Sequence, residues 1–315
     1  FDLGVGALHL LTGKDEHRRL MINAIGPVWD GNEVWLVTGG GALFAAFPEV
    51  YATVFSGFYL AFMLVLCLLI FRAVAIEFRS KLPMLWWRRM WDVSFSVASI
   101  GLSILLGVAF GNIIWGVPLD AQREFAGSFL GLLHPYALLV GVTTLALFMM
   151  HGAIYIALKT EGELHAIARG WINNSIIFFV ICYGLTTMTT LLYLPHMSQQ
   201  MRDYPIFFAV PVLTMLAIAN IPREIHLGSD FLAFLSSGAT MVGLMTLVAT
   251  GIFPTLVLSR PNPDLSLTIY NAASSPKTLT IMLIIALIGV PIVVAYTGSI
   301  YYVFRGKVKL DTMSY

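Results

Sequence analysis

Long runs of apolar residues, separated by short polar clusters, recur along the whole chain. A helix needs about 20 apolar residues to cross the hydrocarbon core of a bilayer, and most of these runs reach or approach that length. Backbone groups inside a bilayer must hydrogen-bond within the protein, which favours helices. The pattern therefore predicts an all-α, polytopic membrane protein. The predicted segments are 1–12, 32–46, 50–78, 92–115, 127–158, 167–194, 205–221, 230–258 and 278–304.

Composition supports this interpretation. Hydrophobic residues make up 58% of the chain and charged residues 11%, whereas soluble domains carry about 25% charged residues. No repeat of fixed period and no soluble domain is visible, so we expect a single transmembrane domain over residues 1–315. The first segment is too short to span a bilayer, and we interpret it as the tail of a first helix that is largely missing from this sequence.

The stretch from Val34 to Phe71 is nearly unbroken, and only Pro48 and Glu49 interrupt it. It forms either one bent crossing or two. With two crossings, and about nine spans in all, most basic residues fall on one side of the membrane, which the positive-inside rule identifies as cytoplasmic. The C-terminus is then cytoplasmic and the native N-terminus periplasmic. The basic side has Lys14, Arg18, Arg19, Arg79, Lys81, Arg88, Arg89, Lys159, Arg169, Arg223, Arg305, Lys307 and Lys309, and the other side has Arg123, Arg202, Arg260 and Lys277.

Two acidic residues lie near the cytoplasmic end of the second segment. Asp30 and Glu33 are spaced i, i+3, so they share one face of a helix. Such a pair can pass protons inward from the cytoplasm. The alternative is a capping box, with Asp30 as the N-cap and Glu33 at N3. Glu49, directly after Pro48, has the composition of an ordinary helix start.

Asp2 lies on an apolar segment without a basic residue in its visible part. Ionisable groups at membrane depth are costly, and they mark functional sites by default. His9 follows about two turns closer to the cytoplasm and can continue a proton relay. Its alternative role is a hydrogen bond to a neighbouring helix.

No cofactor site is expected in this chain. His134 and His151 are 17 residues apart on one predicted helix, about 25 Å along its axis, so they cannot share one iron. Cys67 and Cys182 lie inside apolar runs without a CxxC motif, and they predict neither zinc nor covalently attached haem. The basic residues occur in short clusters, and nothing indicates binding of nucleic acid.

Several motifs point to one family. They are FDLGVG from Phe1, RRLMINAIGPVWDGNEVW, GGALFAAFPEVYATVFSGFY, FRSK followed by MWD, GVAFGN, and GELHAIARG at 162–170. Together they resemble subunit II of the cytochrome bd-type quinol oxidases, the bacterial terminal oxidases unrelated to the haem–copper enzymes. The similarity is densest over residues 1–120 and fades toward the C-terminus.

The resemblance implies an architecture of two four-helix bundles, here about 1–115 and 127–258, plus a peripheral last helix at 278–304. It implies a pseudo-twofold heterodimer with a haem-bearing subunit I, which holds two haems b, one haem d and the quinol-oxidising loop. The complex oxidises quinol and reduces dioxygen to water in the bacterial inner membrane, with protons taken from the cytoplasm. Membrane lipids, a structural quinone and small single-helix accessory subunits are further partners that it allows.

For subunit II the resemblance implies support of haem-site assembly and a contribution to proton and oxygen access. Asp2 and Asp30 match carboxylates placed toward a cytoplasmic proton route, and Trp35 matches an aromatic residue of an oxygen route. Two alternatives stay open. A secondary transporter would have similar hydropathy, but it often has a polar midplane site between paired halves. A purely structural scaffold for subunit I differs only in whether Asp2 and Asp30 move protons.

Overall fold

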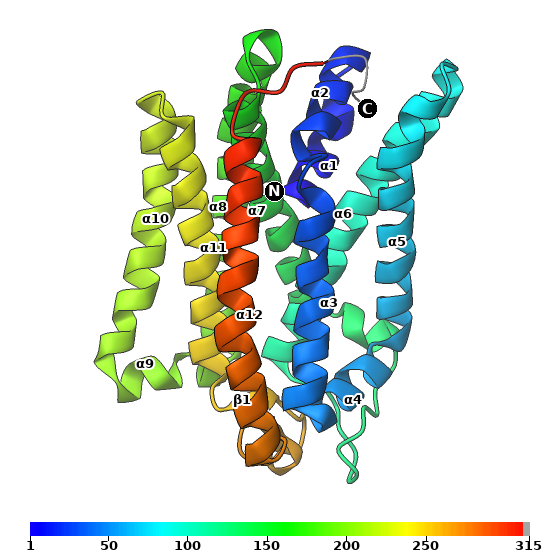
Figure 1. Ribbon diagram of the computed structural model, residues 1–315. Coiled ribbons are helices and arrows are strands. Elements are labelled where there is room, and N and C mark those ends of the chain that lie inside the picture. The colour runs from blue at the N-terminus through cyan, green and yellow to red at the C-terminus, as the bar shows by residue number, and fades with distance from the viewer. Residues whose placement is uncertain (311–315) are drawn as a thin grey trace.

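A computed structural model describes residues 1–310 of the chain. These residues form a block of long helices that run roughly antiparallel to one another (Figure 1). The α-helices are α1 Asp2–Leu8, α2 Asp15–Ile25, α3 Trp29–Ala46, α4 Pro48–Gly57, α5 Tyr59–Phe78, α6 Leu85–Trp115, α7 Pro135–Lys159, α8 Gly162–Tyr193, α9 Gln199–Asp203, α10 Ala209–His226, α11 Asp230–Ile252 and α12 Pro276–Val303. The strands are β1 Thr255–Val257 and β2 Leu267–Thr268, which pair antiparallel.

Seven helices in the described residues are long and apolar enough to cross a membrane: α5, α6, α7, α8, α10 with its preceding turn, α11 and α12. Helix α3 is less apolar because it contains Asp30, Glu33 and three consecutive glycines. It nevertheless runs antiparallel to α5 over much of the height of the block (Figure 1). The prediction of an all-α polytopic membrane protein is confirmed.

Helices α3 and α5 have the antiparallel arrangement expected for the two crossings predicted between Val34 and Phe71. Helix α3 runs away from α2, α4 turns at the opposite end, and α5 returns (Figure 1). Pro48 occupies the first turn of α4 and Glu49 follows it, as expected for a helix start. We call the two ends of the block the α2 end and the β1 end. The predicted basic loops all lie at the α2 end (Figure 1).

Some predicted boundaries were wrong. Helix α6 begins at Leu85 rather than 92, because the Trp- and Arg-rich segment before Asp92 is already helical. Helix α7 begins at Pro135 rather than 127, and α11 ends at Ile252, before β1.

Helix α7 occupies the centre of the block and contacts α1, α6, α8 and α11. Small residues allow these helices to approach closely. A Cβ atom added at Gly4 would lie 1.7 Å from the backbone oxygen of Phe148, and one added at Gly152 would lie 2.5 Å from the backbone carbon of Gly4. The α1–α7 contact is therefore a backbone-to-backbone contact that tolerates no side chain at these two glycines.

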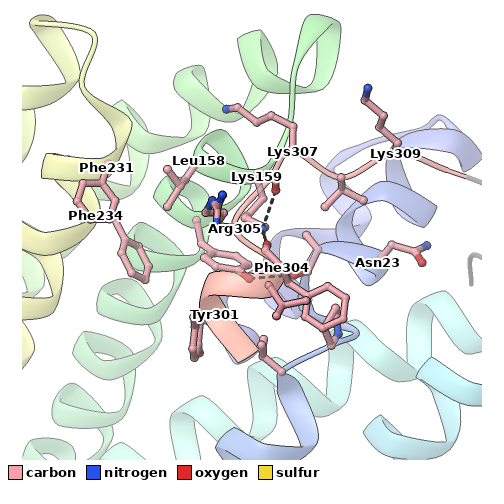
Figure 2. Close-up of a pocket in the computed structure, with 17 residues that line it drawn as sticks. Asn23, Leu158, Lys159, Phe231, Phe234, Tyr301, Phe304, Arg305, Lys307 and Lys309 are labelled. Atoms are coloured by element: carbon pink, nitrogen blue, oxygen red, sulfur yellow. Dashed lines mark hydrogen bonds between the residues drawn. The ribbon is translucent and has the colours of Figure 1, made fainter. Parts of the chain in front are cut away.

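Helix α12 has no buried residue and packs along α3. After α12 the chain crosses the end of α7, where the Val308 amide donates to the Lys159 carbonyl at 2.8 Å. Figure 2 shows this crossing and the cavity beside it. The division into two four-helix bundles stays a prediction.

Candidate functional site

Acidic and basic side chains meet between α1, α3, α5 and α12, and we call them the Asp2–Arg72 cluster. The Asn32 side-chain amide donates to Asp2 Oδ2 at 2.7 Å, and the Tyr301 hydroxyl donates to Asn32 Oδ1 at 3.3 Å. Arg72 Nη1 donates to Glu33 Oε1 and forms an ion pair with it. These contacts join four helices. The members of the cluster are Asp2, Asn32, Glu33, Arg72 and Tyr301.

Burial makes the Asp2–Arg72 cluster unusual. The Arg72 side chain is 0% exposed, and its guanidinium lies 5.8 Å from the Trp29 ring and 5.5 Å from the Phe95 ring. Asp2 is 8% exposed. Among the described residues, Asp2 Oδ1 and two guanidinium nitrogens of Arg72 have no hydrogen-bond partner. Unpaired buried polar atoms are costly, and each one requires an explanation.

Asp30 lies on the exposed side of this cluster. It is in the first turn of α3, whose N-cap is Val28 without a side-chain cap hydrogen bond. The predicted capping box, with Asp30 as N-cap and Glu33 at N3, was therefore wrong. Asp30 and Asp2 both lie close enough to Glu33 to interact with it electrostatically. The structure thus brings together three of the predicted residues, Asp2, Asp30 and Glu33.

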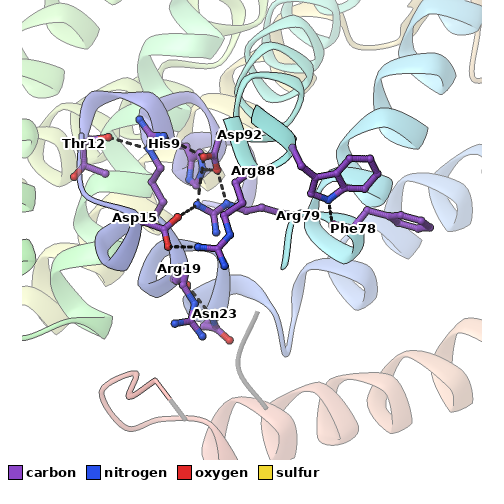
Figure 3. A network of polar contacts seen from close by, with 11 residues as sticks. His9, Thr12, Asp15, Arg19, Asn23, Phe78, Arg79, Arg88 and Asp92 are labelled. Carbon is purple, nitrogen blue, oxygen red and sulfur yellow. Dashed lines mark hydrogen bonds and ion pairs between the residues drawn. The ribbon is translucent and has the colours of Figure 1, made fainter. Parts of the chain in front are cut away.

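His9 belongs to a second group, the Asp92 cluster, which lies near the α2 end (Figure 3). His9 Nε2 is 2.6 Å from Asp92 Oδ1, and both side chains are buried. Arg79 Nε donates to the same oxygen at 2.5 Å, and Arg18 Nη1 donates to Asp92 Oδ2 at 3.0 Å. Asp15 links Arg79 and Arg88 at the edge of this group, with distances of 2.6 and 3.1 Å.

The sequence did not predict the Asp92 cluster as a functional feature. The cationic partners of Asp92 are Arg79 and Arg18, and the buried His9 ring contacts the same carboxylate. The MWD motif marked the position of Asp92, but partners 74 and 83 residues away leave no local signal. The cluster fastens the α1–α2 turn to the α5–α6 turn.

Trp35 lies on α3, two residues after Glu33, and it is 44% exposed in the isolated chain. It is one of several large apolar side chains on this helix that the chain itself does not cover, including Val34, Leu36 and Phe44. This surface is available to a partner or to lipid.

The histidines are mostly engaged within the chain. His134 Nδ1 accepts from the amide of Ala137 at 3.3 Å, and His151 Nδ1 is 2.7 Å from Ser237 Oγ. Within residues 1–310, no group of three His, Cys, Asp or Glu side chains is arranged to hold a metal ion.

Comparison with known proteins identifies the family. The family model for "Cytochrome bd terminal oxidase subunit II" matches residues 1–304. The chain belongs to this family. It is 34% identical to the cytochrome bd-I ubiquinol oxidase subunit 2 of Escherichia coli K12, over 99% of this chain and 90% of that protein. It is 35% identical to the cytochrome bd ubiquinol oxidase subunit 2 of Bacillus subtilis 168, over 98% and 91%.

The fold agrees with this family. The bd oxidase of Geobacillus thermodenitrificans has a chain that matches with a TM-score of 0.77 at 15% identity, covering 96% of this chain and 92% of that one. The resemblance found in the FDLGVG and WDGNEVW motifs is therefore confirmed over nearly the whole subunit II chain.

Proposed function

We propose that this chain is the haem-free subunit II of a membrane-bound quinol:oxygen oxidoreductase, and that it provides a proton route to its haem-bearing partner. Membership of the subunit II family and about 34–36% identity to curated oxidase subunits support the first part. The partner, subunit I, holds two haems b and one haem d, and it oxidises quinol and reduces dioxygen. This assignment replaces the secondary-transporter alternative.

The proposed orientation places the α2 end in the cytoplasm of a bacterial cell with this chain in the inner membrane. Thirteen basic residues at that end against four at the other support it. The described end of the chain after α12 is then cytoplasmic. Small accessory subunits, bound lipids and a structural quinone remain compatible with the large uncovered apolar surface.

One observation supports the proton route above all. The acids run inward from exposed Asp30, through half-buried Glu33, to buried Asp2, where one carboxylate oxygen and two Arg72 nitrogens have no partner among the described residues. Arg72 forms an ion pair with Glu33, and its charge favours the ionised forms of its acidic neighbours.

For His9 we propose a role outside the Asp2–Arg72 cluster. It contacts Asp92 rather than any acid of the Asp2–Arg72 cluster. We propose that its contact with Asp92 holds the α1–α2 turn in place.

Trp35 is the proposed oxygen-route residue. Its exposure beside Val34 and Leu36 gives it an apolar environment, which suits passage of a nonpolar gas. The variant Trp35→Ala should raise the apparent KM for dioxygen with haem content unchanged. An unchanged KM would remove Trp35 from the route.

The test of the proton route is Asp30→Asn in the complete two-subunit complex. Asparagine keeps the shape of the side chain and abolishes its titration, so we expect quinol oxidase turnover to fall by about tenfold or more. The haem spectrum should stay at the wild-type level. The matched control is Glu16→Gln, which removes an exposed acid at the same end without touching the cluster.

The outcomes separate proton transfer from a scaffold role. Turnover and haem content that fall together would identify a scaffold function. Wild-type turnover in Asp30→Asn would contradict the proton route.

A further inference from the structure

A cavity of about 490 Å³ opens at the α2 end, where the chain after α12 crosses α7 (Figure 2). Its volume falls within the range of small-molecule sites. Aromatic and aliphatic side chains from α2, α7, α11 and α12 form its apolar part. They include Ala24, Tyr155, Leu158, Phe231, Phe234, Tyr301 and Phe304.

The polar part of this cavity is cationic. Lys159, Arg305, Lys307 and Lys309 line it, and none of the described lining residues is acidic. The ends of α7 and α12 meet here, and each helix C-terminus contributes about half a negative charge. These two ends offset only about one of the four positive charges.

The contacts of the lysines hold the cavity in shape. Lys159 Nζ donates to the carbonyls of Phe304 and Gly306, and Lys307 Nζ donates to those of Ala157 and Thr160. Lys159, on α7, therefore caps the end of α12, and Lys307, after α12, caps the end of α7. No ion pair to a carboxylate within residues 1–310 neutralises either ammonium group.

The other two cations, Arg305 and Lys309, make fewer contacts with the rest of the chain than Lys159 and Lys307 do. The Arg305 guanidinium stacks over the adjacent Tyr302 ring at 3.9 Å and donates to the Tyr302 carbonyl, so its contacts are local. Both side chains are exposed, and Lys309 extends beyond the end of α12 (Figure 2).

We propose that this cavity binds an anionic phospholipid from the leaflet at the α2 end. The phosphate lies against Arg305, Lys307 and Lys309, and an acyl chain follows Phe231, Phe234 and Tyr301 toward the membrane interior. Basic pockets between membrane helices bind such headgroups by charge complementarity. A zwitterionic lipid would bring its own cation into a cationic site, and a free phosphate would leave the aromatic part of the cavity unused.

The test is native mass spectrometry of the intact two-subunit complex after removal of loosely held lipid. Cardiolipin, phosphatidylglycerol and phosphatidylcholine are added separately. We expect the wild-type complex to retain cardiolipin and phosphatidylglycerol in preference to phosphatidylcholine. The double variant Arg305→Gln/Lys309→Gln should weaken binding of cardiolipin about 30-fold, or about fivefold for each cation removed.

The matched control is Lys81→Gln/Arg89→Gln, which removes two exposed cations from the same end, away from the cavity. Its affinity for cardiolipin should stay within about twofold of the wild type. Equal losses in the two double variants would reduce the effect to general surface charge and overturn the proposal. Wild-type affinity in the cavity variant would overturn it too.

Inorganic phosphate provides a further arm of the test. At millimolar concentration it should not displace cardiolipin, and displacement would identify a simple anion site instead of a lipid site. The proposal rests on membrane insertion and not on the proton route. The haem spectrum and turnover of the same samples report on the proposed function separately.

Discussion

Replacing Gly152 by alanine tests whether α1 and α7 are held by direct backbone contact. The new Cβ atom would lie 2.5 Å from the Gly4 carbonyl carbon and 2.6 Å from the Val5 nitrogen. Ordinary contacts between carbon atoms are about 3.5–4.0 Å, so the two helices must separate by about 1 Å. Backbone atoms cannot rotate away, and the same helices support Asp2 and its cluster.

The expected magnitude comes from two opposing effects. Alanine is favoured over glycine in a helix by about 1 kcal/mol, whereas overpacking a tight contact costs about 1–3 kcal/mol or more. We expect overpacking to dominate at Gly152, because all three of the nearest atoms belong to backbone. The net result should be a loss of about 1–2 kcal/mol in stability.

The assay is thermal denaturation of the purified two-subunit complex, followed by haem absorbance and by tryptophan fluorescence. The control variants are Gly170→Ala and Gly184→Ala on α8, where an added Cβ would meet no atom of this chain within 4 Å. Both should denature at or slightly above the wild-type temperature. A Gly152→Ala complex as stable as these controls would refute the close-contact reasoning.

Three further predictions concern charge and capping. The variant Glu33→Gln removes the ion-pair partner of Arg72, whose side chain is fully buried. Breaking such a pair should lower the free energy of unfolding by about 3–5 kcal/mol, measured by thermal denaturation. A loss below about 1 kcal/mol would contradict the pairing. Asp92→Asn should destabilise the complex by a similar amount, measured by urea denaturation, because Arg79 loses its buried partner; Asp15→Asn, at a half-exposed position, is the milder control. Burial and nearby Arg260 hold the pKa of His134 below its usual value. As the pH falls, the unfolded chain therefore binds a proton at this residue at a higher pH than the folded chain does. The stability of the fold should consequently decrease as the pH drops below about 6.5. His134→Asn keeps a cap without this titration and should flatten the pH dependence of the melting temperature; an unchanged slope would exclude His134 as its source.

The sequence was sufficient for the helices and for their alternation across the membrane. Apolar runs of about 20 residues have few other stable structures in lipid, and the basic loops required a second crossing at Pro48. The start of α6 was missed because Trp86, Trp87 and two arginines lower the local hydropathy, although these residues are compatible with a helix.

The pairing of the charged residues was not predictable in the same way. Asp30 and Glu33 were recognised as a pair on one face, but Arg72, 39 residues after Glu33, was not recognised as the counter-ion of Glu33. Hydropathy reports the depth of a residue and not the helix that lies opposite. Long-range pairs such as His9 with Asp92 depend on how α1 and α6 pack, which periodicity alone does not specify.

The two buried carboxylates differ in a way that separates support from transport. Both oxygens of Asp92 accept a hydrogen bond from Arg79, and each contacts a second group, His9 at Oδ1 and Arg18 at Oδ2. A carboxylate held in this way has no free position for an incoming proton. Asp2 accepts from the neutral amide of Asn32 at one oxygen, and its other oxygen has no partner among the described residues. We therefore expect Asp92→Asn to lower haem content and turnover together, and Asp2→Asn to lower turnover with the haems retained. The same pattern of losses in both variants would mean that this difference in hydrogen bonding does not distinguish their roles.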